Sequence, residues 1–186
     1  MPKSTLIFLT GFSTAGKSTI GPILANALGF DFLDIDKVIV EREQKSINDI
    51  FAEKGEAYFR QLEFEILSSI SHHENLVVSL GGGTLEHDAS FALVRSSGTM
   101  VYLQSDLNTL THRLSSKDDR PLLKGQHGER LSAEAIAHRV RLLMQRRQER
   151  YAQADIYIST DQAPLAETVE QLQRELERHL KSHRHH

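Results

Sequence analysis

The sequence predicts an α/β protein in which a parallel β-sheet is covered on both faces by helices. Short apolar runs alternate along the chain with segments whose apolar residues recur at the spacing of a helix. The first run, Thr5–Thr10, is continuous, as expected for a strand that is buried on both faces of a sheet. An alternation of this kind favours parallel strands that are joined by helical crossovers.

The first half of the chain contains three of the five expected strands, which are Thr5–Thr10, Phe30–Ile35 and Leu76–Leu80. Its helical patterns cover Lys17–Leu28, Ile47–Glu53 and Ala57–Ile70. Gly29 suits the C-terminal end of the first helix, because glycine readily adopts the left-handed conformation found there. Three successive glycines, Gly81–Gly83, stop the third strand.

The second half contains the other two strands, which are Thr99–Leu103 and Ile156–Ser159. Helices are expected at Ala89–Arg95, at Leu107–Leu114, from Ser132 to about Tyr151, and at Leu165–Leu180. Ser132 is a favourable N-cap for the long helix, and Glu134 lies in its first turn, where a negative charge is stabilised.

Composition limits the classes of protein that fit this chain. Its 186 residues suffice for one well-buried core, so we expect a single domain over 1–181 and a polar tail at 182–186. The net charge of −3 gives no electrostatic reason to expect nucleic acid or an anionic membrane as partner. Without cysteine, a disulfide framework or a thiolate metal site is impossible.

The hydrophobic pattern also bears on location. No apolar run approaches the roughly 18 residues of a membrane span, and the first run is too short for the core of a signal peptide. We therefore expect a cytoplasmic protein. A monomer is expected as well, because no heptad pattern suggests otherwise.

The stretch LIFLTGFSTAGKSTIG, which begins at Leu6, contains the pattern G-x-x-x-x-G-K-[ST] between an apolar strand and a helix. The glycines let the backbone turn sharply, and successive N–H groups then form an anion-binding nest at the positive end of the helix. Lys17 supplies a charge for the β- and γ-phosphates, and Ser18 offers a hydroxyl to Mg²⁺. The residues expected to bind a nucleoside triphosphate are Gly11, Ser13, Thr14, Ala15, Gly16, Lys17, Ser18 and Thr19. The loop does not name the acceptor, since GTPases, ATPase motors and small-molecule kinases share it.

Two aspartates follow the second strand in FLDID, at Asp34 and Asp36. On a strand, this spacing would place both side chains on one face, which opens onto the ligand crevice at the carboxyl end of a parallel sheet. One carboxylate could then order water around Mg²⁺, and the other could accept a proton from an alcohol. The alternative is that the two carboxylates cap the next helix.

Two further segments are candidates for binding an anionic acceptor. Arg60 and Glu63 in YFRQLEFEIL lie three residues apart on an expected helix, where they form either a surface ion pair or a grip on a carboxylate. Gly81, Gly82 and Gly83 in VVSLGGG follow a buried strand directly. They either bring backbone N–H groups to a ligand or form a flexible turn.

Two more arginines are candidate site residues. Arg120 in DDRPLL precedes a proline and therefore lies outside a regular helix, where an arginine on a mobile loop could cover a transferring phosphate. Arg147 and Tyr151 lie four residues apart near the end of the long helix. The arginines around them form either a solvated helix face or part of a site.

Together, the motifs GFSTAGKST, FLDID, FRQLE, LGGG and RPLL, followed by R…Y…AD, resemble those of the shikimate kinase family. The resemblance covers about Leu6 to Leu180. The phosphate loop is generic, but D-x-D, F-R-x-x-E and the triple glycine in this order are specific. The resemblance implies a three-layer P-loop NTPase fold with a five-stranded parallel sheet. It further implies a helical substrate-binding segment around 36–64 and a lid around 115–131.

The resemblance also implies a reaction. ATP, with Mg²⁺, would phosphorylate the 3-hydroxyl of shikimate to give shikimate 3-phosphate and ADP, in the biosynthesis of chorismate and aromatic amino acids. The catalytic residues implied are Lys17, which stabilises the moving γ-phosphoryl group, Asp36 as general base, and Arg120, which reaches the ATP phosphates from the lid. The shikimate-binding residues implied are Asp36, Arg60, Gly81, Gly82, Gly83 and Arg147. Ser18 would bind the metal, and Asp34 would help through water.

The chain departs from the family pattern in three respects. The stretch from Arg120 to Arg147 is several residues longer than usual, and no arginine that could lie near adenine follows the last strand. Glu149 stands where the family usually has proline, and Arg146 allows a register shifted by one residue. Arg147 is preferred because Tyr151 and Asp155 then keep the expected spacing.

Three alternatives remain open from the sequence. A gluconate-type kinase shares the loop and fold, although the triple glycine and F-R-x-x-E speak against it. An inactive homologue that serves as a binding protein would be expected to lack Lys17 or the D-x-D motif, and both are present. A GTPase would normally carry an N-K-x-D motif, and the sequence has none.

Overall fold

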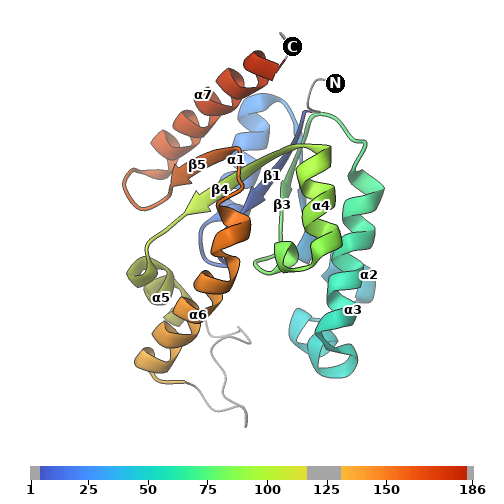
Figure 1. Ribbon diagram of the computed structural model, residues 1–186, viewed down its shortest axis with the longest axis vertical. Helices are drawn as coiled ribbons and strands as arrows, with labels where there is room; N and C mark the ends of the chain where they lie inside the picture. Colours follow the sequence, from blue (N-terminus) through green and yellow to red (C-terminus); the bar gives the residue numbers. More distant parts are fainter. Residues whose placement is uncertain (1–4, 117–130, 184–186) are drawn as a thin grey trace.

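The computed structural model describes residues 5–116 and 131–183 of the chain. Five strands form one parallel sheet in the order β2-β3-β1-β4-β5 (Figure 1). Their bounds are Leu6–Thr10 for β1, Asp31–Asp34 for β2, Leu76–Ser79 for β3, Thr99–Gln104 for β4 and Ile156–Ser159 for β5. The predicted five-stranded parallel sheet is confirmed.

The central strand shows why the apolar runs are continuous. Along β1, Ile7 and Leu9 belong to a core that is shared with α1 (Lys17–Leu28) and α7 (Leu165–His183). Leu6 and Phe8 belong to a second core, which is shared with α3 (Ile47–Ile70) and α4 (Asp88–Ser97). Successive side chains point to opposite faces of a sheet, so a strand covered by helices on both sides is apolar at every position.

The connections place a crevice beside β1. The chain leaves β1 toward the β2 edge of the sheet, and it leaves β4 toward the β5 edge. In open parallel sheets, ligands bind at the carboxyl ends of strands where the connections diverge in this way. The glycine loop after β1 therefore lies where the topology favours a ligand.

The second strand is shorter than predicted, and the helix that follows it lies within the helical segment around 36–64 that the family resemblance implied. β2 ends at Asp34, and α2 covers Ile35–Glu43. Asp34 is the N-cap residue of α2, where its Oδ1 accepts a hydrogen bond from the N–H of Lys37 at 3.3 Å. The prediction that Asp34 and Asp36 share the face of a strand is therefore wrong, because Asp36 lies in the first turn of the helix.

The remaining helices follow their predicted positions closely. The two helices expected at 47–53 and 57–70 form α3, which is broken by a non-helical backbone at Gly55, with φ of 80°. α5 covers Leu107–Ser115, and a short helix, η1, covers Thr84–Glu86. α6 covers Ala133–Tyr151, and its N-cap Ser132 accepts a hydrogen bond from the N–H of Ala135.

The C-terminal helix runs further than expected. α7 continues to His183, so residues 182 and 183 of the predicted tail are helical, and residues 184–186 lie outside the described residues. Within the part of the chain that the structure describes, no helix is both long enough and apolar enough to span a membrane.

Asp155 joins three elements at the edge of the sheet. Its Oδ2 accepts hydrogen bonds from the N–H of Met100 at 2.8 Å and from Nη1 of Arg95 at 3.2 Å. The carboxylate thus ties the turn between α6 and β5 to the start of β4 and to α4. Its side chain is 10% exposed, so these bonds are largely shielded from water.

We predict that Asp155→Ala lowers the free energy of unfolding by about 2 kcal/mol, because a buried donor loses its acceptor. Urea denaturation followed by circular dichroism measures the change. Asp88→Ala is the matched control, since Asp88 pairs with Arg150 while its own side chain is 87% exposed. Equal stabilities of the two variants would contradict the role given to Asp155.

Candidate functional site

The loop after β1 has the backbone that its glycines require. Gly16 is the N-cap residue of α1 and has φ of 98°, in the left-handed region that favours glycine. Gly11 has φ of 141°, and a Cβ atom there would lie 2.7 Å from the carbonyl oxygen of Leu103. Glycine at both positions therefore lets the loop close over the end of β4 and feed into α1.

The two polar residues that begin α1 are held in place by nearby oxygen atoms. Lys17 is 6% exposed, and its Nζ donates to the carbonyl oxygens of Gly11 and Phe12, each at 2.8 Å. The Oγ of Ser18 donates to Oδ2 of Asp34 at 2.8 Å. The loop thus concentrates positive charge at the helix N-terminus, with a hydroxyl and a carboxylate beside it.

A cavity of about 490 Å³ opens over this loop. Every predicted loop residue from Ser13 to Thr19 lines it, whereas Gly11 shapes the turn and does not line it. Its opposite wall comes from the ends of α5 and β5 and from the start of α7, with Arg113, Thr160 and Leu165 among the lining residues.

Arg113 is a site residue that the sequence analysis did not identify. Its Nη1 donates to the carbonyl oxygen of Thr14 at 3.4 Å, and its Nη2 donates to that of Thr160 at 3.4 Å. Asp161 lies 3.6 Å from Nη2, and its carboxylate also accepts hydrogen bonds from Ser105 and from the N–H of Asp106. No motif surrounds Arg113 in the sequence, so only the packing of α5 beside the loop reveals it.

The triple glycine lies at the meeting point of the other predicted residues. A Cβ at Gly82 would lie 3.4 Å from the backbone nitrogen of Ser13 and 3.5 Å from Nη1 of Arg147. A Cβ at Gly83 would collide with the guanidinium of Arg60. The turn therefore brings the phosphate loop and both predicted carboxylate-binding arginines together.

The first glycine faces the acidic part of the site. A Cβ at Gly81 would lie 2.9 Å from Oδ1 of Asp36 and from Oγ1 of Thr84, and it would collide with Oε1 of Glu63. Asp36 and Glu63 are therefore close neighbours, although Asp36 is on α2 and Glu63 is on α3. Glycine is required here because the two carboxylates occupy the space of a side chain.

Arg60 and Glu63 form an ion pair that is not on the surface. Nη1 of Arg60 lies 2.5 Å from Oε2 of Glu63, whose side chain is 0% exposed. Burial raises the pKa of Glu63, while Arg60 and the Thr84 hydroxyl oppose the rise. Burial disfavours the charge of Arg60 too, but Glu63 and Glu56 hold the pKa of Arg60 above its ordinary value. The arginine thus remains charged inside a half-buried site.

Of the two neighbouring arginines on α6, only Arg147 turns inward. It is 8% exposed, and its guanidinium lies over the ring of Phe12 at 5.6 Å from the ring centre. The side chain of Arg146 is 68% exposed. Glu86 binds both, since its Oε1 accepts from Nε of Arg147 and its Oε2 pairs with Nη2 of Arg146, each at 2.7 Å. The bond at Nε directs the other end of the Arg147 guanidinium toward Gly82.

A smaller cavity of about 320 Å³ adjoins the cavity over the loop at Ser18. Ser18, Asp34 and Asp36 line it together with side chains of α2, and Ser18 also lines the cavity over the loop. The hydroxyl of Ser18 and the carboxylate of Asp34 are oxygen ligands of the kind that Mg²⁺ prefers, and they lie beside the phosphate loop. The residues present thus fit a magnesium ion that arrives with a nucleotide. Arg120 and nearly all of the predicted lid lie outside the described residues.

The fold and the loop define the class of protein. A parallel sheet in this strand order, with a G-x-x-x-x-G-K-S loop feeding the helix after β1, is a phosphate-loop nucleotide-binding fold. Beside the loop, two arginines and an aspartate surround a glycine turn. This arrangement suits a small anionic acceptor and therefore a small-molecule kinase.

Comparison with known proteins places the chain within this class. The family model described as shikimate kinase matches residues 13–177. A shikimate kinase of Chloroherpeton thalassium is 62% identical over 98% of this chain and 97% of its own. The crystal structure of a shikimate kinase from Bacteroides thetaiotaomicron is 31% identical and covers 93% of this chain and 98% of its own, with a TM-score of 0.84. A shikimate kinase from Acinetobacter baumannii, solved in complex with shikimate, is 28% identical and covers 92% of each chain, with a TM-score of 0.81. The chain belongs to the shikimate kinase family.

Proposed function

We infer that the chain is an ATP-dependent kinase that transfers the γ-phosphoryl group of ATP to the 3-hydroxyl of shikimate. The products are shikimate 3-phosphate and ADP, in a step of aromatic amino-acid biosynthesis. One observation supports the roles assigned to individual residues of this chain. The glycine turn touches Asp36, Arg60, Arg147 and the backbone of the phosphate loop at once, so an acceptor bound there would lie beside the phosphates.

The nucleotide side of the site comprises Gly11, Gly16 and the loop residues that line the larger cavity. Their backbone N–H groups and the N-terminus of α1 would bind the phosphates, and Lys17 would stabilise the charge on the γ-phosphoryl group as it moves. Arg113, on the far wall of the same cavity, would contact the nucleotide away from its phosphates. Arg113 would thus take the role near adenine for which no arginine is found after the last strand.

Ser18 and Asp34 would hold Mg²⁺, Ser18 directly and Asp34 through water. When bound, the ion would neutralise phosphate charge and orient the phosphate oxygens. The chain's own contribution is to place a hydroxyl and a carboxylate at the junction of the two cavities.

The acceptor side would hold shikimate by its carboxylate and its hydroxyls. Arg60 and Arg147 would bind the carboxylate, since a guanidinium matches a carboxylate with two parallel hydrogen bonds. Backbone groups of Gly81–Gly83 would approach the ring closely, because no side chain intervenes. Asp36 would accept hydrogen bonds from hydroxyls and take the proton of the attacking one.

Glu63 and Glu86 would position the two arginines. Glu63 binds Arg60 within α3, and Glu86 of η1 binds Arg147 of α6 in addition to the exposed Arg146. Fixing a guanidinium before the ligand binds lowers the ordering cost of binding. Each arginine therefore presents its remaining N–H groups in a set direction.

Other features of the proposal rest on the sequence and the family. Arg120 would reach the ATP phosphates from a lid at about 115–131 and exclude water as the site closes. The substrate-binding segment would cover about 36–64, within a single domain over 1–181. A monomeric, cytoplasmic enzyme that binds ATP and shikimate, and neither nucleic acid nor membrane, completes the proposal.

The experiment that tests the function is ADP release from Mg·ATP with no acceptor, with shikimate, and with gluconate. Stimulation by shikimate alone supports the proposal, because only shikimate combines a ring carboxylate with the hydroxyl to be phosphorylated. Stimulation by gluconate alone would show that gluconate, and not shikimate, is the acceptor. If the protein binds ATP but neither shikimate nor gluconate stimulates ADP release, the protein is an inactive homologue.

For Asp36→Asn we predict a loss in kcat of about 10²-fold to 10⁴-fold, as expected when a general base is removed and the shape of the site is kept. Steady-state kinetics at saturating shikimate and ATP measures it, with circular dichroism as a check on folding. A kcat near that of the unchanged enzyme would remove Asp36 from the role of base.

For Glu86→Gln we predict a KM for shikimate that is raised about fivefold to tenfold, with the KM for ATP unchanged, because Arg147 loses the anion that directs it. Asp88→Asn is the matched control, since it removes the neighbouring and exposed ion pair to Arg150 on the same helix. If both variants raised the KM for shikimate equally, the positioning role of Glu86 would be refuted.

A further inference from the structure

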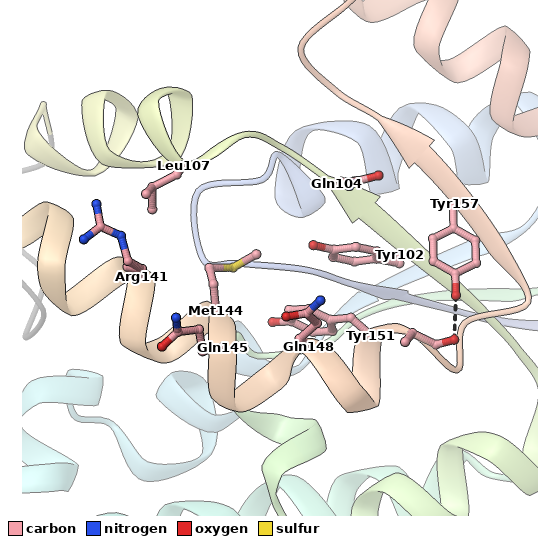
Figure 2. Close-up of a pocket in the computed structure, with 10 residues that line it drawn as sticks. Tyr102, Gln104, Leu107, Arg141, Met144, Gln145, Gln148, Tyr151 and Tyr157 are labelled. Carbon is pink, nitrogen blue, oxygen red and sulfur yellow. Dashed lines mark hydrogen bonds between the residues drawn. The ribbon is translucent and has the colours of Figure 1, made fainter.

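A third cavity, of about 400 Å³, lies between α6 and the strands β4 and β5. It is separate from the site described above, since none of the loop, aspartate or substrate arginine residues lines it. Its volume falls within the range of about 300–1,000 Å³ that small-molecule sites occupy. Figure 2 shows its walls, with side chains of α6 on one side and Tyr102 and Tyr157 of the sheet on the other.

The walls are rich in aromatic surface. The rings of Tyr102 and Tyr151 stack with centroids 4.6 Å apart, and Tyr157 meets Tyr102 edge to face at 6.1 Å. These are three of the four tyrosines in the chain. Tyr157 is 50% exposed although it lies on a strand, and Met144 adds a polarisable thioether. Surfaces of this kind favour a planar aromatic ring.

Polar groups in the cavity have unused hydrogen-bonding capacity. Within residues 5–116 and 131–183, the side-chain amides of Gln104, Gln145 and Gln148 and the hydroxyl of Tyr102 make no hydrogen bond. The hydroxyl of Tyr157, by contrast, donates to the carbonyl oxygen of Ala152 at 2.6 Å, as the dashed line in Figure 2 shows. The three amides and the free hydroxyl could therefore bind a polar substituent on an aromatic ring.

The charge of the cavity favours an anion. Among the described residues that line it, Arg141 is the one that is charged, and it forms no ion pair with any carboxylate of residues 5–116 and 131–183. These lining residues include no carboxylate, so they offer an ammonium group no ion-pair partner. An aromatic amino acid is therefore a poorer fit than an aromatic acid without the amine.

The spacing along α6 sets the size of the ligand. Arg141 and Gln148 are seven residues apart on this helix, which corresponds to two turns and about 10 Å. The side chain of Arg141 is long enough to bridge part of that span. A ring beside the tyrosines and a carboxylate at Arg141 must therefore be separated by a short chain.

We propose that this cavity binds an aromatic carboxylate whose ring and carboxylate are joined by a short alkyl chain. The ring packs against Tyr102, Tyr157 and Met144, the glutamine amides bind its polar substituent, and Arg141 binds the carboxylate. The site is distinct from the acceptor site, and its occupancy is measured through the ligand itself. The proposal thus stands or falls independently of the function proposed above.

Tyr151 connects the cavity to the acceptor site. Its ring forms part of the cavity, and its hydroxyl donates to the carbonyl oxygen of Gly82 at 3.3 Å. The same helix carries Arg147. Because this hydrogen bond and the shared helix connect the two sites physically, an occupant is expected to change the KM for shikimate at least about twofold and leave the KM for ATP unchanged. An unchanged KM for shikimate at saturating occupant would overturn this connection.

The test is a calorimetric titration with 3-(4-hydroxyphenyl)propionate, in the presence of saturating shikimate and ADP so that the arginines of the acceptor site are occupied. Two matched probes are titrated in parallel. 3-(4-Hydroxyphenyl)propionamide lacks the charge, and 3-cyclohexylpropionate lacks the aromatic ring. We expect the aromatic acid to bind, and each matched probe to bind about tenfold more weakly, a difference of about 1.4 kcal/mol.

Variants then show whether the aromatic acid binds in this cavity. Arg141→Gln should weaken binding of the aromatic acid about tenfold, to the affinity of the amide probe. Tyr157→Ala should weaken binding of both aromatic probes. Arg174→Gln is the matched control, because Arg174 is an exposed arginine on α7, which packs against α1 and the opposite face of the sheet. The proposal is overturned if the aromatic acid does not bind, if Arg141→Gln binds it as well as Arg174→Gln does, or if shikimate and the aromatic acid compete so that they cannot bind at the same time.

Discussion

The site depends on the close approach of one backbone turn to four other parts of the chain. At Gly81 the space of a side chain is taken by the carboxylates of Asp36 and Glu63, and at Gly83 it is taken by the guanidinium of Arg60. At Gly82 the phosphate loop and the guanidinium of Arg147 lie at van der Waals distance from the position of a Cβ. A Cβ at Gly81 or Gly83 would displace charged groups, because it would occupy the volume that their atoms already fill. The absence of side chains at Gly81 and Gly83 thus allows α2 and α3 to approach the turn after β3, beside the phosphate loop and α6.

The two arginines of the acceptor side are each held by a neighbouring glutamate. Arg60 is bound by buried Glu63, and Arg147 is bound by Glu86, which is 18% exposed. A buried ion pair contributes little net stability, because the desolvation of both charges opposes their attraction. What such a pair provides is orientation, since each guanidinium keeps its remaining donors pointed into the site.

Helix α6 is the element that links the site to the rest of the molecule. Its N-terminal part packs in the core with α1 and α7 through Ile136 and Val140, and its last residue, Tyr151, packs in the core on the opposite face of the sheet. Between these anchors lie Arg147 and the wall of the tyrosine-lined cavity. A change in the position of α6 therefore acts on the acceptor site and on that cavity together.

The sequence by itself determined the features that depend on local pattern. Glycine spacing specified the loop after β1, and apolar periodicity specified five strands and the interruption of α3 at Gly55, because these signals lie within one turn or one element. Only the tertiary structure decided that Asp34 ends its strand as a helix cap, and that Arg113 reaches the cavity over the loop. The spacing to Tyr151 and Asp155 favoured Arg147 over Arg146, and the tertiary structure shows that Arg147 is the one that turns inward. A shift of one residue rotates a side chain by about 100° around a helix, and the packing of α6 against the sheet sets that rotation.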